Sequence, residues 1–413
     1  MSSRFSLLRE PNFARVFAAR LISAFGTPMG PVALPFAVLE DLHGTARDVG
    51  LVIAAASAAQ VTFLLLGGAL ADRGSRRGQM VIADLAAAGA QGTIAVLLAL
   101  QLASVPSLIL LELVIGTALA LQHPAAVGLV PLVVEREALQ PANALLAIAQ
   151  STAMGLGAAV AGLVAAQFGA RVALAIDALT FLVSALLVSG VRERAQARGA
   201  PSESLWAELR DGWREFTSHR WLWTIVLQFT VMLVGWFGAY GVVGPVVAKR
   251  ALGGAAAWGV IAAANGFGNI AGGLVILRVH FARPMLVATL CCFSFALLPL
   301  ALIQPLPVPW IAAAAFSAGF TGEIFGVLWY TALHTHVDAA ALSRVSAYDA
   351  VGSIALVPLG EVAAGFALDA YGPAVTLLAA CAAIVVPTAA VLLVPEVRGL
   401  RAEAQVTSTQ LAS

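Results

Sequence analysis

A few ionisable side chains stand within long apolar stretches of this sequence, where a charge is costly and a functional role is the default explanation. Burial in an apolar environment raises the pKa of a carboxyl group toward neutrality, which lets the group take up and release a proton near pH 7. Glu323 lies near the middle of its apolar stretch and is the first candidate. The full set of candidates for proton exchange is Glu323, Glu112, Asp177, Glu361 and His123.

Other polar and aromatic side chains could line a binding cavity. Aromatic rings with a polar tip suit substrates that are bulky and partly apolar. Ordinary packing between helices is the alternative for each residue, and Arg20 could instead form a structural pair with a nearby acid. The cavity candidates are Arg20, Gln122, Gln228, Trp236, Tyr240, Trp329 and Tyr330.

Other chemistries find little support. His334, His336 and Asp338 hint at metal ligands, but the two histidines point apart in a helix and no third ligand is assured. We therefore expect no metal site and no cofactor. The net charge of +1 argues against a nucleic-acid partner. The chain has no Gly-Lys-Ser or Gly-Lys-Thr phosphate-binding loop, so it is not expected to hydrolyse ATP.

The elements that position these residues are membrane helices. The chain has 413 residues, of which 60% are hydrophobic and 11% charged, with a mean hydropathy of +0.92. A soluble domain carries about 25% charged residues, so lipid must be the main solvent. The stretches are too long and too apolar for barrel strands. We expect twelve transmembrane helices, at 13–39, 46–71, 78–102, 104–131, 140–167, 170–190, 221–247, 255–277, 284–303, 306–333, 345–369 and 373–395.

The basic residues predict the orientation of these helices, because Lys and Arg concentrate in cytoplasmic loops. Of the 23 Lys and Arg residues, a cytoplasmic N-terminus puts 18 on the cytoplasmic side and 4 outside, with Arg20 within the first span. We therefore expect a multi-pass protein of the cell membrane with both termini in the cytoplasm.

A polar break at 191–219 separates six spans from six. Its apolar residues are spaced along one side of a short helix, which we expect to lie in the cytoplasmic membrane interface. A regulatory or partner-binding helix is the alternative. These apolar residues are Leu205, Trp206, Leu209, Trp213 and Phe216.

The two halves of the chain resemble each other. A shift of 203 residues aligns the fourth to sixth spans with the tenth to twelfth without a gap, and glycines match at several positions. We expect residues 1–190 and 220–413 to form two pseudo-symmetric six-helix bundles, an organisation typical of secondary transporters that bind substrate between the halves. The matching glycines are Gly116 with Gly319, Gly157 with Gly360, and Gly169 with Gly372.

The segment Gly68-Ala69-Leu70-Ala71-Asp72-Arg73-Gly74-Ser75-Arg76-Arg77 resembles the signature loop of the major facilitator superfamily, G-x-L-x-D-R-x-G-R-R, with Ser75 in place of a glycine. Its carboxylate could face a positive helix N-terminus, and its arginines could pair with acids or lipid headgroups. Contacts of this kind act as a conformational latch when the halves close on the cytoplasmic side. A basic loop without a further role is the alternative. The latch residues would be Gly68, Asp72, Arg73, Arg76 and Arg77.

The segments 139–146, 176–182 and 326–331 resemble the efflux branch of that superfamily, which includes macrolide exporters and the enterobactin exporter. The resemblance implies alternating access and proton-coupled export of a small molecule. It also makes the first, fourth, seventh and tenth spans cavity-lining, which favours structural roles for Asp84 and Asp177. This chain departs from related antiporters at Glu112, where many have arginine, and at 157–162, where their proline is absent.

We therefore expect a monomeric secondary transporter that exports small amphipathic molecules such as drugs, secondary metabolites or siderophores, coupled to H⁺. Uptake, or export of sugars or amino acids, is an alternative within the same fold. A polytopic membrane enzyme or a transport-inactive scaffold is an alternative of another class.

Overall fold

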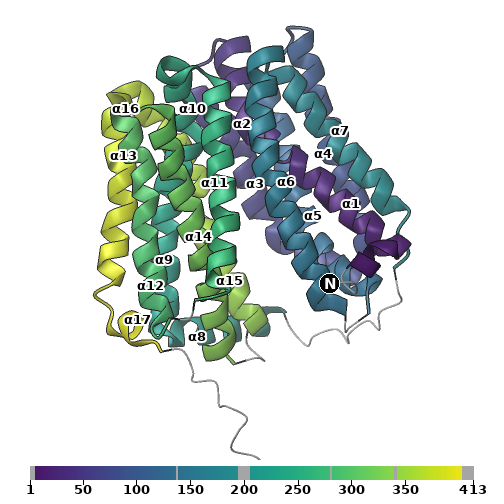
Figure 1. The fold of residues 1–413 in the computed structure, drawn as a ribbon, viewed down its shortest axis with the longest axis vertical. Coiled ribbons are helices and arrows are strands. Elements are labelled where there is room, and N and C mark those ends of the chain that lie inside the picture. The colour runs from purple at the N-terminus through teal and green to yellow at the C-terminus, as the bar shows by residue number, and fades with distance from the viewer. Residues whose placement is uncertain (1–4, 136–137, 194–204, 280, 339–341, 402–413) are drawn as a thin grey trace, which may run out of the picture.

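The computed structural model describes residues 5–135, 138–193, 205–279, 281–338 and 342–401, and the secondary structure in these ranges is helical throughout. Two bundles of long helices lie side by side (Figure 1). The N-terminal bundle contains α1 (Pro11–Gly26), α2 (Met29–Phe36), α3 (Ala46–Arg73), α4 (Arg76–Ala99), α5 (Val105–Val133), α6 (Leu139–Phe168) and α7 (Ala170–Ser189).

The C-terminal bundle follows a crosswise helix, α8 (Leu205–Ser218). It contains α9 (Arg220–Phe237), α10 (Gly244–Val247), α11 (Ala255–Ile276), α12 (Pro284–Cys291), α13 (Leu297–Ile303), α14 (Val308–His336), α15 (Leu342–Ile354) and α16 (Val357–Val391), with the short α17 (Pro395–Gly399) after it. The expected all-α fold of two six-helix bundles is confirmed.

The described helices include eleven segments long and apolar enough to span a bilayer. The last of these, Tyr348–Val391, is 44 residues long, about twice what one crossing needs. Within it Gly372 has φ 76° and ψ 174°, a conformation that a residue with a Cβ rarely adopts, so two helices meet there. The described chain therefore makes twelve crossings.

The first span of each bundle is irregular. After α2, residues Ala37–Asp41 form a π-helical turn, and α9 is followed by π-helical turns at Gly238–Val243 and Ala248–Leu252. A proline within a helix removes a backbone hydrogen bond, and π-turns are frequent at functional sites. Pro31 and Pro245 occupy equivalent places, each directly after a glycine.

The repeat that the sequence predicts is visible helix by helix. The helices α5 and α14 each have 29 residues and are offset by 203 positions at both ends. Gly169 and Gly372, also 203 apart, both have positive φ, 85° and 76°. A Cβ on Gly116 would lie 2.1 Å from the carbonyl oxygen of Ala56, and one on Gly319 would lie 2.0 Å from that of Asn265. Both bundles therefore use the same close helix contact.

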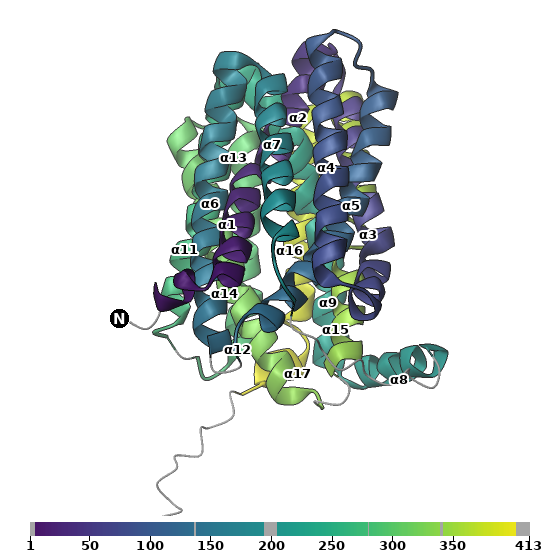
Figure 2. The same ribbon diagram turned by 90° about the vertical axis from the view of Figure 1, so that its right-hand side faces the viewer.

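The helix α8 lies across the end of the molecule that carries the start of α1, crosswise to the long helices (Figure 2). Phe216 is buried and its ring lies 5.9 Å from that of Tyr348 on α15, while Trp213 is 53% exposed and contacts both rings. The part of the linker at 194–204, and the side chains of Leu205, Trp206 and Leu209, lie outside the described residues.

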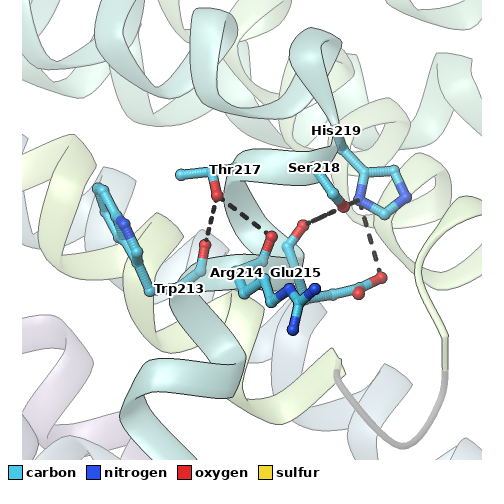
Figure 3. Close-up of polar contacts among 6 residues, drawn as sticks. All are labelled: Trp213, Arg214, Glu215, Thr217, Ser218 and His219. Carbon is cyan, nitrogen blue, oxygen red and sulfur yellow. Dashed lines mark hydrogen bonds and ion pairs between the residues drawn. The ribbon is translucent and has the colours of Figure 1, made fainter.

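Local hydrogen bonds fix the corner between α8 and α9 (Figure 3). The Ser218 hydroxyl donates to the Glu215 carbonyl at 2.7 Å, and His219 Nδ1 lies 3.8 Å from the Glu215 carboxylate. These contacts tie His219, the residue before α9, to the last turn of the linker helix.

Candidate functional site

A cavity of about 650 Å³ lies between the bundles and is lined by residues from both. Its walls come from α2 to α7 on one side and from α9, its following π-turn, α11, α14 and α16 on the other. Apolar side chains such as Ile115, Met154 and Phe237 form most of the surface. Ligand pockets of roughly 300–1,000 Å³ hold drug-sized molecules, so this cavity is large enough for one.

Four carboxyl groups face this cavity. Glu112 on α5 and Asp177 on α7 belong to the N-terminal bundle, are 6% and 3% exposed, and lie within electrostatic range of each other. Glu323 on α14 is half-buried, and Glu361 on α16 is 2% exposed. All four carboxylic candidates for proton exchange therefore line one cavity, including Asp177, for which the resemblance had favoured a structural role.

The acids do not follow the internal repeat. At an offset of 203 positions, Glu112 corresponds to Ala315, and Asp177 corresponds to Ala380. The same offset relates Glu323 to Ala120. The scaffold is thus duplicated, whereas each half supplies carboxyl groups of its own.

Glu361 lies where the two bundles cross. Ser57 of α3 is its hydrogen-bonding neighbour, and its Oε2 atom is buried without a hydrogen-bond partner in the described structure. A Cβ on Gly50 of α3 would lie 2.6 Å from the Glu361 carbonyl oxygen, so α3 and α16 are in backbone contact here. Leaving a buried polar atom without a partner costs about 1–3 kcal/mol of stability. Such an atom is unusual in a carboxyl group whose role is purely structural.

Polar residues that sequence reasoning did not single out also line the cavity. Asn265 and Asn269 stand one turn apart on α11, and Gln91 on α4 lies near the N-terminal acids. Polar residues at an i, i+4 spacing within a membrane helix mark a face that avoids lipid, and this signal could have identified the asparagines. The pattern Gly266-x-Gly268-x-x-Ala271, which contains them, is a helix segment and not a nucleotide loop.

Among the predicted cavity residues, Tyr240 lines the cavity, and Trp236 stacks behind it with ring centroids 5.2 Å apart. Gln228 is buried within the C-terminal bundle and donates to Thr388 Oγ1 at 3.1 Å. The Trp329 indole N–H donates to Asp349 at 2.9 Å. Tyr330 is 59% exposed. These last three side chains do not line the cavity in the described structure.

Gln122 belongs to a separate polar network. Its side-chain amide donates to Asp84 Oδ1 at 2.8 Å, and the Ser184 hydroxyl donates to Asp84 Oδ2 at 2.6 Å. Asp84 therefore joins α4, α5 and α7 inside the N-terminal bundle, away from the cavity. Arg20 and His123 do not line the cavity. Each continues the cavity-lining face of its helix, α1 or α5, toward the end of the molecule where α1 begins.

The cavity is closed at the end of the molecule that carries residues 42–45, here called the closed end. The end that carries α8 and the start of α1 is called the terminal end. A Cβ on Gly162 of α6 would lie 2.5 Å from the Cα of Gly259 on α11, which brings the two bundles into backbone contact near the closed end. The Lys249 ammonium also donates to the Leu39 carbonyl across the interface.

A second set of contacts closes the same end between α3 and α16. The carboxylate of Asp369 accepts a hydrogen bond of 3.0 Å from the backbone N–H of Arg47, in the first turn of α3. The Arg47 guanidinium lies 4.4 Å from the centroid of the Phe366 ring. Thr45 and Asp48 form a capping box at the start of α3 that needs no partner from the other bundle. Toward the terminal end the ribbons of the two bundles spread apart (Figure 1).

Comparison with known proteins identifies the family. The sequence profile of transmembrane secretion effectors, a family of the major facilitator superfamily, matches residues 2–413. The chain belongs to this family. The transporter is 30% identical over 379 residues to the enterobactin exporter of Shigella boydii serotype 18, a match that covers 86% of this chain and 87% of that one.

Solved structures confirm the fold of the transporter. A point mutant of the nucleoside transporter NupG superposes with a TM-score of 0.76 at 13% identity, over 92% of this chain and 99% of that one. A D-xylose–proton symporter superposes with a TM-score of 0.68 at 14% identity, over 94% and 99%. At these identities the likeness concerns the fold alone.

The signature loop of the transporter packs on its own bundle. The Arg76 guanidinium donates to the Gly128 carbonyl at 2.6 Å, and that of Arg77 donates to the Val191 carbonyl at 3.2 Å. Gly68 faces open space, since a Cβ added there would have no neighbouring atom within 4 Å. The side chains of Asp72 and Arg73 lie outside the described residues. The latch role of this loop stays a prediction.

Proposed function

We propose that this transporter exports small amphipathic molecules from the cell in exchange for protons, by alternating access of the central cavity. The observation that carries the proposal is the position of four carboxyl groups around one cavity between two bundles. The relatives named enterobactin exporters support the direction of transport.

The charge distribution supports an orientation with the terminal end in the cytoplasm, because most loop arginines lie at that end. In that orientation the closed end faces outward, and this structure corresponds to an inward-facing state. A monomer suffices for this mechanism, since one chain supplies both walls of the cavity.

The proposed exchange uses the cavity acids as shared sites for protons and substrate. From the outside, where the pH is lower, protons neutralise the carboxyl groups and lower the cost of burying them when the bundles rock. On the inside, a substrate with hydrogen-bond donors binds the ionised carboxylates and displaces the protons. The two ligands then favour opposite transitions, which is the thermodynamic requirement for coupling.

Glu361 has a distinct part in this exchange. Since it lies at the contact between α3 and α16, its charge would be solvated when the bundles separate and buried when they close. Protonation therefore favours closure at this contact, which links the proton to the conformational change.

The experiment uses the purified transporter in proteoliposomes with an imposed pH gradient. The compounds to be measured are enterobactin, a macrolide, ethidium, a sugar and an amino acid. We expect movement of at least one amphipathic compound toward the compartment of lower pH, and loss of this movement when a protonophore collapses the gradient.

Two variants test the acids directly. Glu112→Gln and Glu323→Gln keep side-chain size but cannot exchange protons, and each is expected to reduce gradient-driven transport at least about tenfold. Glu396→Gln, an exposed glutamate on α17, is the matched control and should transport normally. Unchanged gradient dependence in both cavity variants would refute proton coupling through these acids, and movement of the sugar or amino acid alone would refute the substrate class.

A further inference from the structure

Arg20 is a cation at membrane depth without an acidic partner. It stands midway along α1, its side chain is half-buried, and no carboxylate among the described residues lies within 4 Å of its guanidinium. Its side-chain partner among the described residues is Gln150 on α6, whose amide oxygen, oriented toward the arginine, accepts hydrogen bonds of 2.7 Å from Nε and 3.3 Å from Nη2. Within the part of the chain that the structure describes, the remaining guanidinium donors have no acceptor and could bind another one.

Arg20 stands on the side of the first helix that continues into the cavity. It lies seven residues, or two helical turns, before the cavity-lining Thr27, which directly follows α1 and continues the same helix face. On α5 the cavity-lining residues Glu112, Ile115 and Leu119 continue at the same spacing to His123, which is exposed. The Arg20 charge lies within electrostatic range of the His123 ring, so two basic groups face the route from the terminal end.

The apolar part of a molecule with an anionic group at Arg20 has a place in the central cavity, whose surface is mostly apolar. A separate apolar pocket of about 470 Å³ also lies between α1 and α6, but Arg20 and Gln150 do not line it. At about 100° per residue, its lining residues lie on other faces of the two helices than these side chains, so it is not part of the basic site.

We infer that Arg20, Gln150 and His123 form a binding site for the anionic group of an amphipathic substrate, on the route from the terminal end to the central cavity. A guanidinium with free donors matches carboxylate, sulfonate or phosphate oxygens, and charge-assisted bonds of this kind are the strongest in proteins. His123 and Glu112 are eleven residues apart on α5, roughly 16 Å by helix rise, so the anion and the cavity carboxylates do not share a site. The inference rests on the proposed export and specifies its substrate class.

The test compares two dyes with the same aromatic body. The anionic probe is 8-anilinonaphthalene-1-sulfonate, and the neutral probe, N-phenyl-1-naphthylamine, lacks the sulfonate. Binding to the transporter in nanodiscs of phosphatidylcholine is measured by equilibrium dialysis at one pH throughout, with empty nanodiscs subtracted. The variants are Arg20→Gln, Arg20→Lys and, as the matched control, Arg398→Gln on the exposed surface of α17.

We expect Arg20→Gln to weaken binding of the sulfonate about tenfold or more and to change binding of the neutral dye less than twofold. The affinity of Arg20→Lys for the sulfonate should lie between those of Arg20→Gln and the wild type, because lysine keeps the charge and loses the paired donors. The control should bind both dyes as the wild type does. An equal loss for both dyes, or no loss for the sulfonate in either Arg20 variant, would overturn the inference.

A second arm distinguishes substrate from lipid, because a phospholipid phosphate has the same chemistry as the proposed anionic group. The measurement is repeated in nanodiscs that contain phosphatidylglycerol, an anionic lipid whose phosphate has no choline cation beside it. Each variant is compared with the wild type in the same lipid, because an anionic bilayer repels the sulfonate from all of them. If an anionic lipid headgroup is the natural occupant, the difference in sulfonate affinity between the wild type and Arg20→Gln disappears, and the substrate assignment is rejected. Dye binding needs no pH gradient, so a negative result in the binding assay leaves the export proposal standing. Conversely, if binding depends on Arg20 but no transport is measured in proteoliposomes, the export proposal alone is rejected.

Discussion

At the scale of single residues, the contrast between Asp84 and Glu361 separates two kinds of buried acid. Asp84 accepts hydrogen bonds from Gln122 and Ser184 on its two oxygens, and it does not line the central cavity. Glu361 faces the cavity and has Ser57 as a hydrogen-bonding neighbour, and its Oε2 atom has no partner among the described residues. Two hydrogen bonds favour the charged form of a carboxyl group, and Glu361 lacks one of them, which is why the proposal assigns proton exchange to Glu361 and a structural role to Asp84.

We predict that Glu361→Gln separates proton coupling from substrate exchange. The glutamine keeps the volume and a contact to Ser57, but it has no proton to release. Transport driven by a pH gradient should fall at least about tenfold, while exchange of labelled for unlabelled substrate at equal pH should continue. Both are measured in proteoliposomes with the compound that the panel identifies.

Asp84→Asn is the matched control for this prediction. It should lower the thermal unfolding temperature of the transporter, because it removes an acceptor from a satisfied buried network, and leave gradient dependence in place. Glu361→Gln with full gradient dependence would show that this acid is not part of the coupling.

The candidate acids could be identified from the sequence, since a carboxyl group in an apolar stretch is unusual by itself. The sequence could not show which of these acids line the same cavity, because the rotation of each helix about its axis is fixed by packing against segments that are distant in the chain. Asp177 reaches the cavity through the close approach of α1 and α7, where a Cβ on Gly26 would lie 2.7 Å from its carboxylate. Gln228 turns away from the cavity to bond Thr388, 160 positions later.

At the scale of elements, the glycines of the repeat set how closely helices approach. We predict that Gly116→Ala and Gly319→Ala each destabilise the transporter by about 1–3 kcal/mol, because the new methyl group would meet a backbone carbonyl at 2.1 and 2.0 Å. The measurement is unfolding of the purified variants in detergent.

Gly326→Ala provides the control on the same helix as Gly319. No atom lies within 4 Å of a Cβ there, so the substitution should stabilise the helix by about 0.5–1 kcal/mol or leave it unchanged. Equal destabilisation at Gly326 and Gly319 would mean that close packing is not the cause.

The linker helix offers a prediction of its own. Phe216 is 6% exposed against Tyr348, and its truncation in Phe216→Ala should loosen α8 from α15. Trypsin should then cleave faster after Arg210 and Arg214, both exposed on α8. Trp213→Ala should have a smaller effect, since that side chain is already 53% exposed; equal rates in the two variants would argue against this docking.

Much of the element order follows from the sequence, because apolar length predicts each crossing and the 203-residue register predicts the duplication. The irregular first spans follow from Gly30-Pro31 and Gly244-Pro245. The packing of Phe216 against Tyr348 could not be predicted, because an amphipathic helix can place its apolar side on lipid or on protein with the same pattern.

At the scale of the whole molecule, the interface between the bundles is sealed at the closed end and its ribbons diverge at the terminal end (Figure 1). Alternating access requires the α3–α16 contact to break in each cycle. We predict that a disulfide between Arg47→Cys and Asp369→Cys, in a background without the native cysteines, stops transport until a reductant is added.

The control disulfide joins Ser104→Cys and Ser107→Cys, which are in contact within one bundle at the same end. It should leave transport intact under oxidation. Transport that persists with the Arg47–Asp369 pair oxidised would contradict rocking about the central cavity.

The capping box at the start of α3 has a consequence for the energetics of each turnover. Thr45 and Asp48 cap the N-terminus of α3 from within the same segment of the chain. Breaking the hydrogen bond between the Arg47 N–H and Asp369 therefore costs about 0.5–1.5 kcal/mol and does not unfold the end of the helix. One proton descending one pH unit releases about 1.4 kcal/mol. The Arg47–Asp369 hydrogen bond is therefore a small part of the α3–α16 contact, comparable in size with the energy of one proton crossing a shallow gradient. On the proposed coupling, that proton favours closure of the contact, and substrate binding favours its opening.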